Sequence, residues 1–181
     1  MPLDEMADKG VGYGGGVADY GPGREEVVPD FPNRTVVVAQ FAGFDVVLSG
    51  SRSAIYTEMH LSVERVLESP VTLFPGATIT AVTNGGAVRL PNGRVLEFQT
   101  RPRAFVPVPG SRYLFVLRRM LEGDFYLITK SIELRDSKVL PNSKDDVARA
   151  EEGTWPFLDL DENHVVGEVN RLLLAQKRGA K

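Results

Sequence analysis

Arginines gathered in the middle of the chain are the residues best suited to binding chemistry. Residues 84–119 contain seven arginines and a single acid, Glu97. The planar guanidinium group donates in a fixed fork that matches carboxylate and phosphate oxygens. Aromatic residues lie between the arginines, and basic grooves with stacking rings commonly hold single-stranded nucleic acid. Five arginines are therefore candidates for an anionic-ligand site: Arg89, Arg94, Arg101, Arg103 and Arg112.

The same arginines have a second interpretation, in which they surround a folded domain and balance acids elsewhere. The chain carries a net charge of −3 and has a pI near 5.5, unlike a domain built as a whole to hold nucleic acid. Residues 1–33 alone contain seven acids against Lys9 and Arg24. Nucleic acid is therefore the alternative partner and not the leading one.

A polar row around His60 is the next candidate. Glu58 and His60 fall on the same face of an expected strand as Tyr56, so a small polar cluster can form there. A zinc site needs a third ligand placed by the fold. The chain has only one other histidine, His164. We expect a solvated strand face and no metal site.

Asp159, Asp161 and Asn163 stand at the spacing of the first ligands of a calcium loop. The loop requires a glycine at its sixth position, where this chain has His164. Because Asp161 directly precedes a helical pattern, capping of that helix explains the acid more simply.

Covalent and cofactor chemistry lack a motif in this chain. There is no cysteine, which removes thiol nucleophiles and thiolate metal sites. Gly10, Gly12 and Gly15 match a GxGxxG spacing, but the strand and helix that must flank a dinucleotide site are missing. With no nucleophile or phosphate-loop motif either, we expect a protein that is not an enzyme and uses no cofactor.

Residues 1–33 are predicted to form a flexible leader, and residues 34–181 a single domain. The leader holds seven of the 18 glycines and shows no periodic apolar face. Such a segment buries too little surface to offset the entropy lost on ordering.

About seven short strands are predicted between residues 34 and 140. The clearest begins at residue 55, where the residues expected in the core are Ile55, Met59, Leu61 and Val63, and those expected outside are Tyr56, Glu58 and His60. A slip in the alternation at residues 65–67 indicates a bulge. Asn92-Gly93 predicts a hairpin turn, and the apolar run at residues 112–119 predicts a strand covered on both sides.

Helices are expected only late in the chain. Residues 144–152 form a short polar candidate ended by Gly153. A longer helix is expected from an Asp161 cap to about Lys177, with an apolar stripe of Val165, Val169, Leu172 and Leu173. We expect this helix, with Trp155 and Phe157, to close one end of a barrel.

This order of elements predicts a mostly β fold, an OB-like antiparallel β-barrel with a C-terminal helix. Many short strands with regular turns are typical of barrels and sandwiches. The long strand with a slip favours the barrel, because a bent strand can serve both halves of a small Greek-key barrel.

Three stretches carry a resemblance to a known group of proteins. YTEMHLSVERVL at residues 56–67 is followed by PGSRYLFVL at residues 109–117 and FYL at residues 125–127. The set resembles exported bacterial proteins with a netrin- or TIMP-like OB barrel, which implies that fold over residues 34–140 and implies export. TIMP-like inhibitors act through an N-terminal cysteine, which this chain lacks, so inhibition of metalloproteases does not carry over.

We therefore expect a non-enzymatic binding or interaction module whose partner is a protein or an anionic ligand. The alternative is an OB-type binder of single-stranded nucleic acid or another anionic polymer through residues 84–119. No apolar run approaches the ~18 residues of a membrane span. The resemblance places the protein in the periplasm or outside the cell, and a native start at Met1 would place it in the cytoplasm.

Overall fold

The structure, a computed structural model, describes residues 28–50, 54–98, 107–121, 123–142 and 144–179. The glycines of the GxGxxG spacing, as well as Arg101 and Arg103, lie outside the described residues. The described elements are β1 (Arg34–Leu48), β2 (Ile55–Glu68), β3 (Thr78–Asn84), β4 (Gly86–Arg89), β5 (Val95–Phe98), β6 (Arg112–Arg119), β7 (Tyr126–Arg135), β8 (Lys138–Leu140), α2 (Lys144–Glu151) and α3 (Glu162–Gly179).

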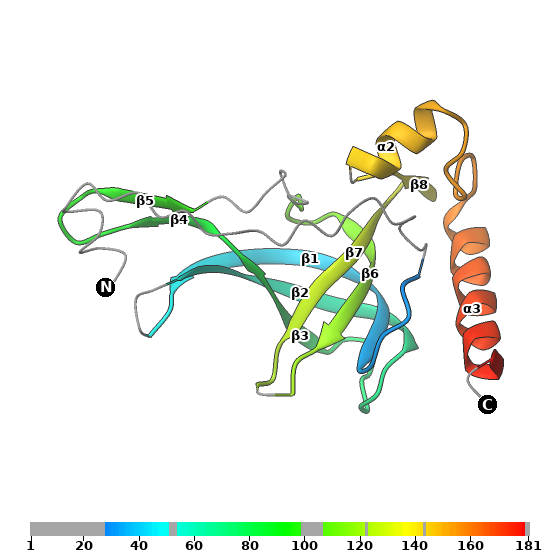
Figure 1. Ribbon diagram of the computed structural model, residues 1–181, viewed down its shortest axis with the longest axis horizontal. Coiled ribbons are helices and arrows are strands. Elements are labelled where there is room, and N and C mark those ends of the chain that lie inside the picture. Colours follow the sequence, from blue (N-terminus) through cyan, green and yellow to red (C-terminus); the bar gives the residue numbers. More distant parts are fainter. Residues whose placement is uncertain (1–27, 51–53, 99–106, 122, 143, 180–181) are drawn as a thin grey trace.

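Five strands close into a barrel in the order β3-β2-β1-β6-β7 (Figure 1). Neighbours along this order are antiparallel, and a parallel pairing of β3 with β7 through Ala81 and Tyr126 closes the ring. A partly open five-stranded Greek-key barrel is the OB architecture. The predicted OB-like barrel with a C-terminal helix is confirmed.

Residues 34–39 of β1 and 113–117 of β6 are buried on both faces, because their alternating residues serve two separate cores. Val37 and Phe115 point into the barrel, where they pack in one cluster with Leu61. Their neighbours Val36 and Leu114 point outward into a second cluster. This alternation follows from the two-residue period of a strand, and it confirms, for residues 113–117, the prediction that this strand is covered on both sides.

The helix α3 covers the second cluster from outside the barrel (Figure 1). Its buried residues are Val165, Val166, Val169 and Leu173, while Leu172 is half-buried. Asp161 accepts a hydrogen bond from the backbone N–H of His164 at 2.9 Å, so it caps the helix as predicted. The predicted stripe is correct apart from Val166, which sequence reasoning left out.

The expectation that α3, Trp155 and Phe157 close one end of the barrel is wrong. Trp155 and Phe157 are buried and meet edge to face at 5.7 Å between ring centroids. They pack with Val36 and Val38, whose side chains point away from the barrel interior. The helix therefore covers an outer face of the sheet, because β1 and β6 present apolar side chains there too.

The register of β2 agrees with the sequence prediction. Ile55, Met59, Leu61 and Val63 are all at most 5% exposed, and His60 lies on the opposite face. The slip predicted at residues 65–67 appears as two shifts in the pairing with β1, next to Val63 and Val66. A further shift in the pairing of β1 with β2 lies between Phe41 and Gly43, inside a strand that runs without interruption from Arg34 to Leu48.

The leader was expected to be flexible as far as residue 33, and its described end differs from that expectation. Val28 is 2% exposed and belongs to the cluster under α3. Gln176 donates from its amide to the Val28 carbonyl oxygen at 3.0 Å. Residues 28–33 thus pack on the domain, because Val28 and Phe31 add apolar surface to that cluster.

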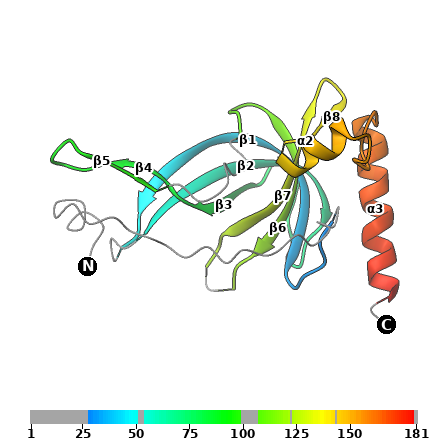
Figure 2. The same cartoon turned by 45° about the horizontal axis from the view of Figure 1, so that its top comes forward.

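The ends of β1 and β2 run on past the barrel and form an arm with the β4–β5 hairpin (Figures 1 and 2). The arm comprises residues 43–48, residues 55–58 and the hairpin. The hairpin meets β1 and β2 at Gly86, whose φ of +134° disfavours other residues. A Cβ there would lie 2.6 Å from Val46 Cγ1 and 2.9 Å from Thr57 Oγ1, so the hairpin packs closely on the arm.

Candidate functional site

Arg112, one of the five candidate arginines, is held between two carboxylates. It lies 2.7 Å from Glu64 Oε2 and 2.9 Å from Glu162 Oε2. The hydrogen bonds that Arg112 donates to Glu64 and Glu162 raise the pKa of Arg112 above its ordinary value. This arginine joins β2, β6 and the first turn of α3, so its charge is already compensated within the fold.

The other two candidate arginines that the structure describes, Arg89 and Arg94, lie apart from Arg112. Arg89 and Arg94 are exposed on the β4–β5 hairpin, which projects from the barrel on the side away from α3 (Figures 1 and 2). Arg101 and Arg103 lie outside the described residues. Within the described chain, the predicted basic site is therefore divided between two ends of the molecule.

Two further arginines of the same segment also have partners within the fold. The Arg118 guanidinium lies 4.7 Å from the ring centroid of Phe31, at cation–π distance. Arg119 forms an ion pair of 3.6 Å with Asp124. Arg112 and Arg119 thus balance acids within the fold, as in the second interpretation of this segment, whereas Arg118 contacts an aromatic ring.

The polar row on β2 forms a cross-strand contact with β1. His60 Nε2 lies 2.9 Å from Asp45 Oδ2, and Glu58 is the strand partner of Asp45. Among the described residues, no three His, Asp or Glu side chains are grouped as a metal site requires. The calcium spacing gathers no such group either, and its Asp161 serves as the helix cap.

The capping hydrogen bond changes the pKa of the Asp161 carboxylate. The backbone hydrogen bond from His164, followed by the His164 side chain, lowers the pKa of Asp161. The His164 Nδ1 atom lies 2.9 Å from Asp161 Oδ2. A carboxylate at this position also interacts favourably with the N-terminal end of the helix dipole.

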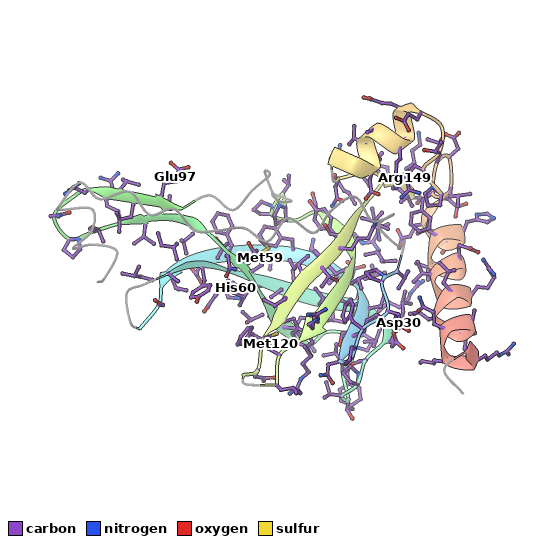
Figure 3. The ribbon with its side chains drawn as sticks, in the orientation of Figure 1. Asp30, Met59, His60, Glu97, Met120 and Arg149 are labelled. Carbon is purple, nitrogen blue, oxygen red and sulfur yellow. The ribbon has the colours of Figure 1, made fainter. Side chains whose placement is uncertain are left out.

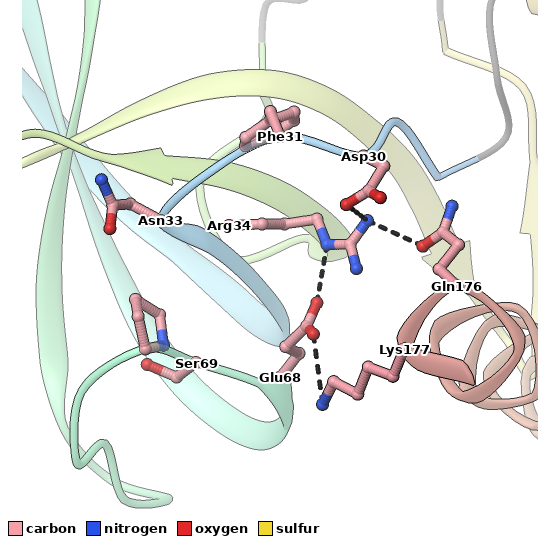
Figure 4. Close-up of a pocket in the computed structure, with 9 residues that line it drawn as sticks. Asp30, Phe31, Asn33, Arg34, Glu68, Ser69, Gln176 and Lys177 are labelled. Atoms are coloured by element: carbon pink, nitrogen blue, oxygen red, sulfur yellow. Dashed lines mark hydrogen bonds and ion pairs between the residues drawn. The ribbon is translucent and has the colours of Figure 1, made fainter. Parts of the chain in front are cut away.

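A polar pocket that sequence reasoning missed lies between the barrel and the end of α3 (Figure 4). Its volume is about 350 Å³. At its centre the Arg34 side chain, only 6% exposed, donates to Glu68 Oε2 at 2.6 Å. Arg34 also donates to the Pro29 carbonyl at 2.9 Å and to Gln176 Oε1 at 2.8 Å.

The pocket is internally neutral. Lys177 lies 3.2 Å from Glu68, and Asp30 lies 3.3 Å from Arg34, so two cations face two carboxylates. Burial by itself raises the pKa of Glu68, but the hydrogen bonds and charges of Arg34 and Lys177 outweigh it and lower that pKa. The cluster fastens β1, β2, α3 and the start of the described chain to one another.

The described chain also contains a buried ion pair and a second cavity. Lys130 on β7 lies 3.5 Å from Asp146 on α2, with side chains 5% and 1% exposed, so this pair attaches α2 to the barrel.

The cavity, about 500 Å³, lies beside α3 and is lined by Val28, Pro156, Phe157, Leu160, His164, Glu168, Leu172 and Gln176.

The outer face of β2 and β3 carries polar, half-exposed side chains. On β2 this face carries Tyr56, Glu58 and His60. His60 points to the side of the strand opposite to Met59 (Figure 3). Val82 and Thr80 of β3 pair with Glu58 and His60 in the ladder. OB folds bind oligonucleotides and oligosaccharides on this face of the barrel. The buried side chains of α3 belong to the other outer face, with β1 and β6.

Comparison with known proteins returned no match, neither to a protein-family model nor to a curated protein sequence. Neither described helix has both the length and the apolar character needed to cross a membrane.

Proposed function

We propose that this protein is a non-enzymatic OB-like binding module whose contact surface is the outer face of β2 and β3 together with the arm. This proposal rests on a difference between the two outer faces of the barrel: α3 covers one of them and leaves the other exposed. On β1 and β6, apolar residues are covered by α3, whereas Tyr56, Glu58 and His60 on β2 stay half-exposed. As the sequence resemblance implies, we place this activity in the periplasm or outside the cell.

The binding of an anionic polymer through the arginine-rich segment is the second proposal, and the geometry supports it less. Arg112 is neutralised by Glu64 and Glu162, and the β2 face carries Glu58 beside Asp45. Among the described residues, this second proposal is supported by Arg89 and Arg94, which are exposed on the hairpin. This proposal predicts single-strand binding that falls steeply as salt is raised.

Site-specific photocrosslinking in the producing cells tests the leading proposal. A benzophenone amino acid placed at Tyr56 should give a discrete protein adduct, because this side chain lies on the proposed contact face. The matched control places it at Leu174, which is 57% exposed on α3. Equal adduct patterns at both positions, or none at Tyr56, would overturn the proposal. An adduct removed by nuclease would favour the anionic-polymer alternative.

A further inference from the structure

The outer edge of β1 along the arm is an incomplete part of the sheet. β1 pairs with β2 from Val36 to Leu48, but it pairs with β6 only from Arg34 to Gln40. Phe41 still bonds to Ser111 and Gly110. After that point, no described strand pairs with the outer edge of residues 43–48. An open strand edge offers a row of backbone donors and acceptors to another chain.

The hydrogen bonds of the β1–β2 hairpin show which backbone groups face the open edge. Ser49 N donates to the Ala54 carbonyl at 2.8 Å. Bonded and non-bonded pairs alternate along an antiparallel ladder, so the bonded pairs that follow involve Val47 and Asp45. The backbone N–H and C=O groups of the intervening residues therefore point to the open edge: Phe44, Val46 and Leu48.

We propose that this edge binds an extended segment of a partner protein as an added strand, and that this segment alternates apolar and basic residues. This inference rests on the proposed binding function and names its partner. In strand addition, the main-chain hydrogen bonds provide affinity and the alternating side chains provide specificity.

The side chains flanking the edge define this partner. On one side Phe44 is 53% exposed, although it stacks on Phe41 at 6.3 Å between ring centroids. An apolar residue of the added strand would cover its ring. On the other side the Asp45 side chain is 72% exposed, although it contacts His60 Nε2 at 2.9 Å, and Glu58 is its ladder partner. Opposite charges on neighbouring strands stabilise pairing, so the residue beside Asp45 is basic.

The hairpin that carries Arg89 and Arg94 does not lie on the same face of the arm as Asp45. The hairpin packs through Gly86 against the Val46 side chain. Val46 and Asp45 are adjacent in the strand, so their side chains point to opposite faces. The two carboxylates thus lie on the face of the arm opposite to the one on which the hairpin packs.

The first experiment measures binding of synthetic peptides to the full chain by calorimetry. A peptide of about ten residues, enough for one strand, alternates valine and lysine, and its control alternates valine and glutamate. We expect the lysine peptide to bind at least about tenfold more tightly. Asp45→Lys should abolish this preference, while Asp124→Lys, 96% exposed on the β6–β7 turn, should keep it. Equal binding of both peptides would overturn the proposal.

The second experiment tests the main-chain contact by amide hydrogen exchange. The amides of Phe44, Val46 and Leu48 should exchange freely in the free chain and slow down with the lysine peptide. Phe44→Pro removes one edge donor without removing a bond to β2, and should weaken binding about tenfold or more. Amides already protected in the free monomer would show that the chain covers its own edge, which overturns the proposal.

A second copy of this chain could occupy the open edge of β1 in place of a partner protein, and sedimentation distinguishes the two cases. A dimer that Phe44→Pro separates, observed by sedimentation, would assign the edge to self-association and overturn the peptide partner. If peptide binding fails while the adduct at Tyr56 persists, this inference alone fails. If both fail, the proposed function fails as well.

Discussion

At the scale of the residue, the arginines that lie between elements of the fold act through their carboxylate partners. Arg34 is nearly inaccessible, and Glu68 is its closest counter-charge. Arg112 is held between Glu64 and Glu162. A buried charge is costly unless it is paired and hydrogen-bonded. Arg34, and Arg112 at a more exposed position, therefore join elements of the fold through their carboxylate partners.

Replacing Glu68 should reveal this pairing through its pH dependence. The pKa of Glu68 is lowered from 4.5 because Arg34 and Lys177 outweigh the effect of burial. A carboxylate with a depressed folded-state pKa contributes stability above its unfolded pKa, and this is lost as pH falls through the folded value. Glu68→Gln should therefore cost roughly 1–3 kcal/mol near neutral pH, and the difference from wild type should shrink below the unfolded value of 4.5.

Urea unfolding at a series of pH values measures this effect, with Glu168→Gln as the control. Glu168 is paired with Arg171 on the exposed side of α3, and that hydrogen bond lowers its pKa too. Because solvent screens an exposed pair, Glu168→Gln should change stability little at any pH. Similar losses for the two variants would contradict the role assigned to the Arg34 cluster.

At the scale of the element, α3 depends on the barrel for its stability. An isolated helix of this length is marginal in water, and valines lower its intrinsic propensity. Its buried face packs with Val36 and Leu114 from the outer face of the sheet. The helix and the outward residues of β1 and β6 thus depend on each other.

Adjacent leucines on α3 test this dependence. Leu173 is 3% exposed, whereas Leu174 is 57% exposed. Leu173→Asp places an unpaired charge in an apolar cluster and should lower the thermal midpoint strongly. Leu174→Asp should leave the midpoint nearly unchanged. If both variants behave alike in thermal unfolding followed by circular dichroism, α3 does not pack as described.

The arm requires a residue without a side chain at position 86, and a substitution of Gly86 tests this requirement. A methyl group at this position would collide with Val46 and Thr57, and the positive φ adds strain. Gly86→Ala should cost roughly 1–3 kcal/mol and shift the resonances of Val46 and Thr57. Gly43→Ala is the control, because a Cβ there meets nothing within 4 Å. Comparable chemical denaturation curves for both variants would contradict the close packing.

At the scale of the whole molecule, two cores share the strands β1 and β6. Val37 and Phe115 belong to the barrel core, and Val36 and Leu114 belong to the core under α3. A strand cannot leave one core without leaving the other. We therefore expect the barrel and the helix to unfold as one unit.

Trp155 makes this expectation measurable, because it is the only tryptophan and lies in the core under α3. Met59 is 5% exposed and lies only in the barrel core. Met59→Ala should cost ~2–5 kcal/mol and shift the Trp155 fluorescence transition together with the circular dichroism transition. A fluorescence midpoint that stays in place while circular dichroism shifts would show two independent units.

The sequence by itself determined most of the local structure. The alternation from Ile55 to Val63, the Asn92-Gly93 turn and the Asp161 cap all appear where predicted. Strand alternation, turn conformation and helix capping depend on residues a few positions apart. The OB-like class followed from the order of these elements and from the long bent strand.

Only the tertiary structure decided what the charged and apolar side chains do. Arg112 meets carboxylates 48 and 50 positions away in the chain, and Arg34 meets Gln176 at a separation of 142. Likewise, the apolar stripe of α3 did not reveal that it covers an outer face of the sheet. The strength of an ion pair or an apolar contact depends on distance and burial in space, and long-range pairing sets both.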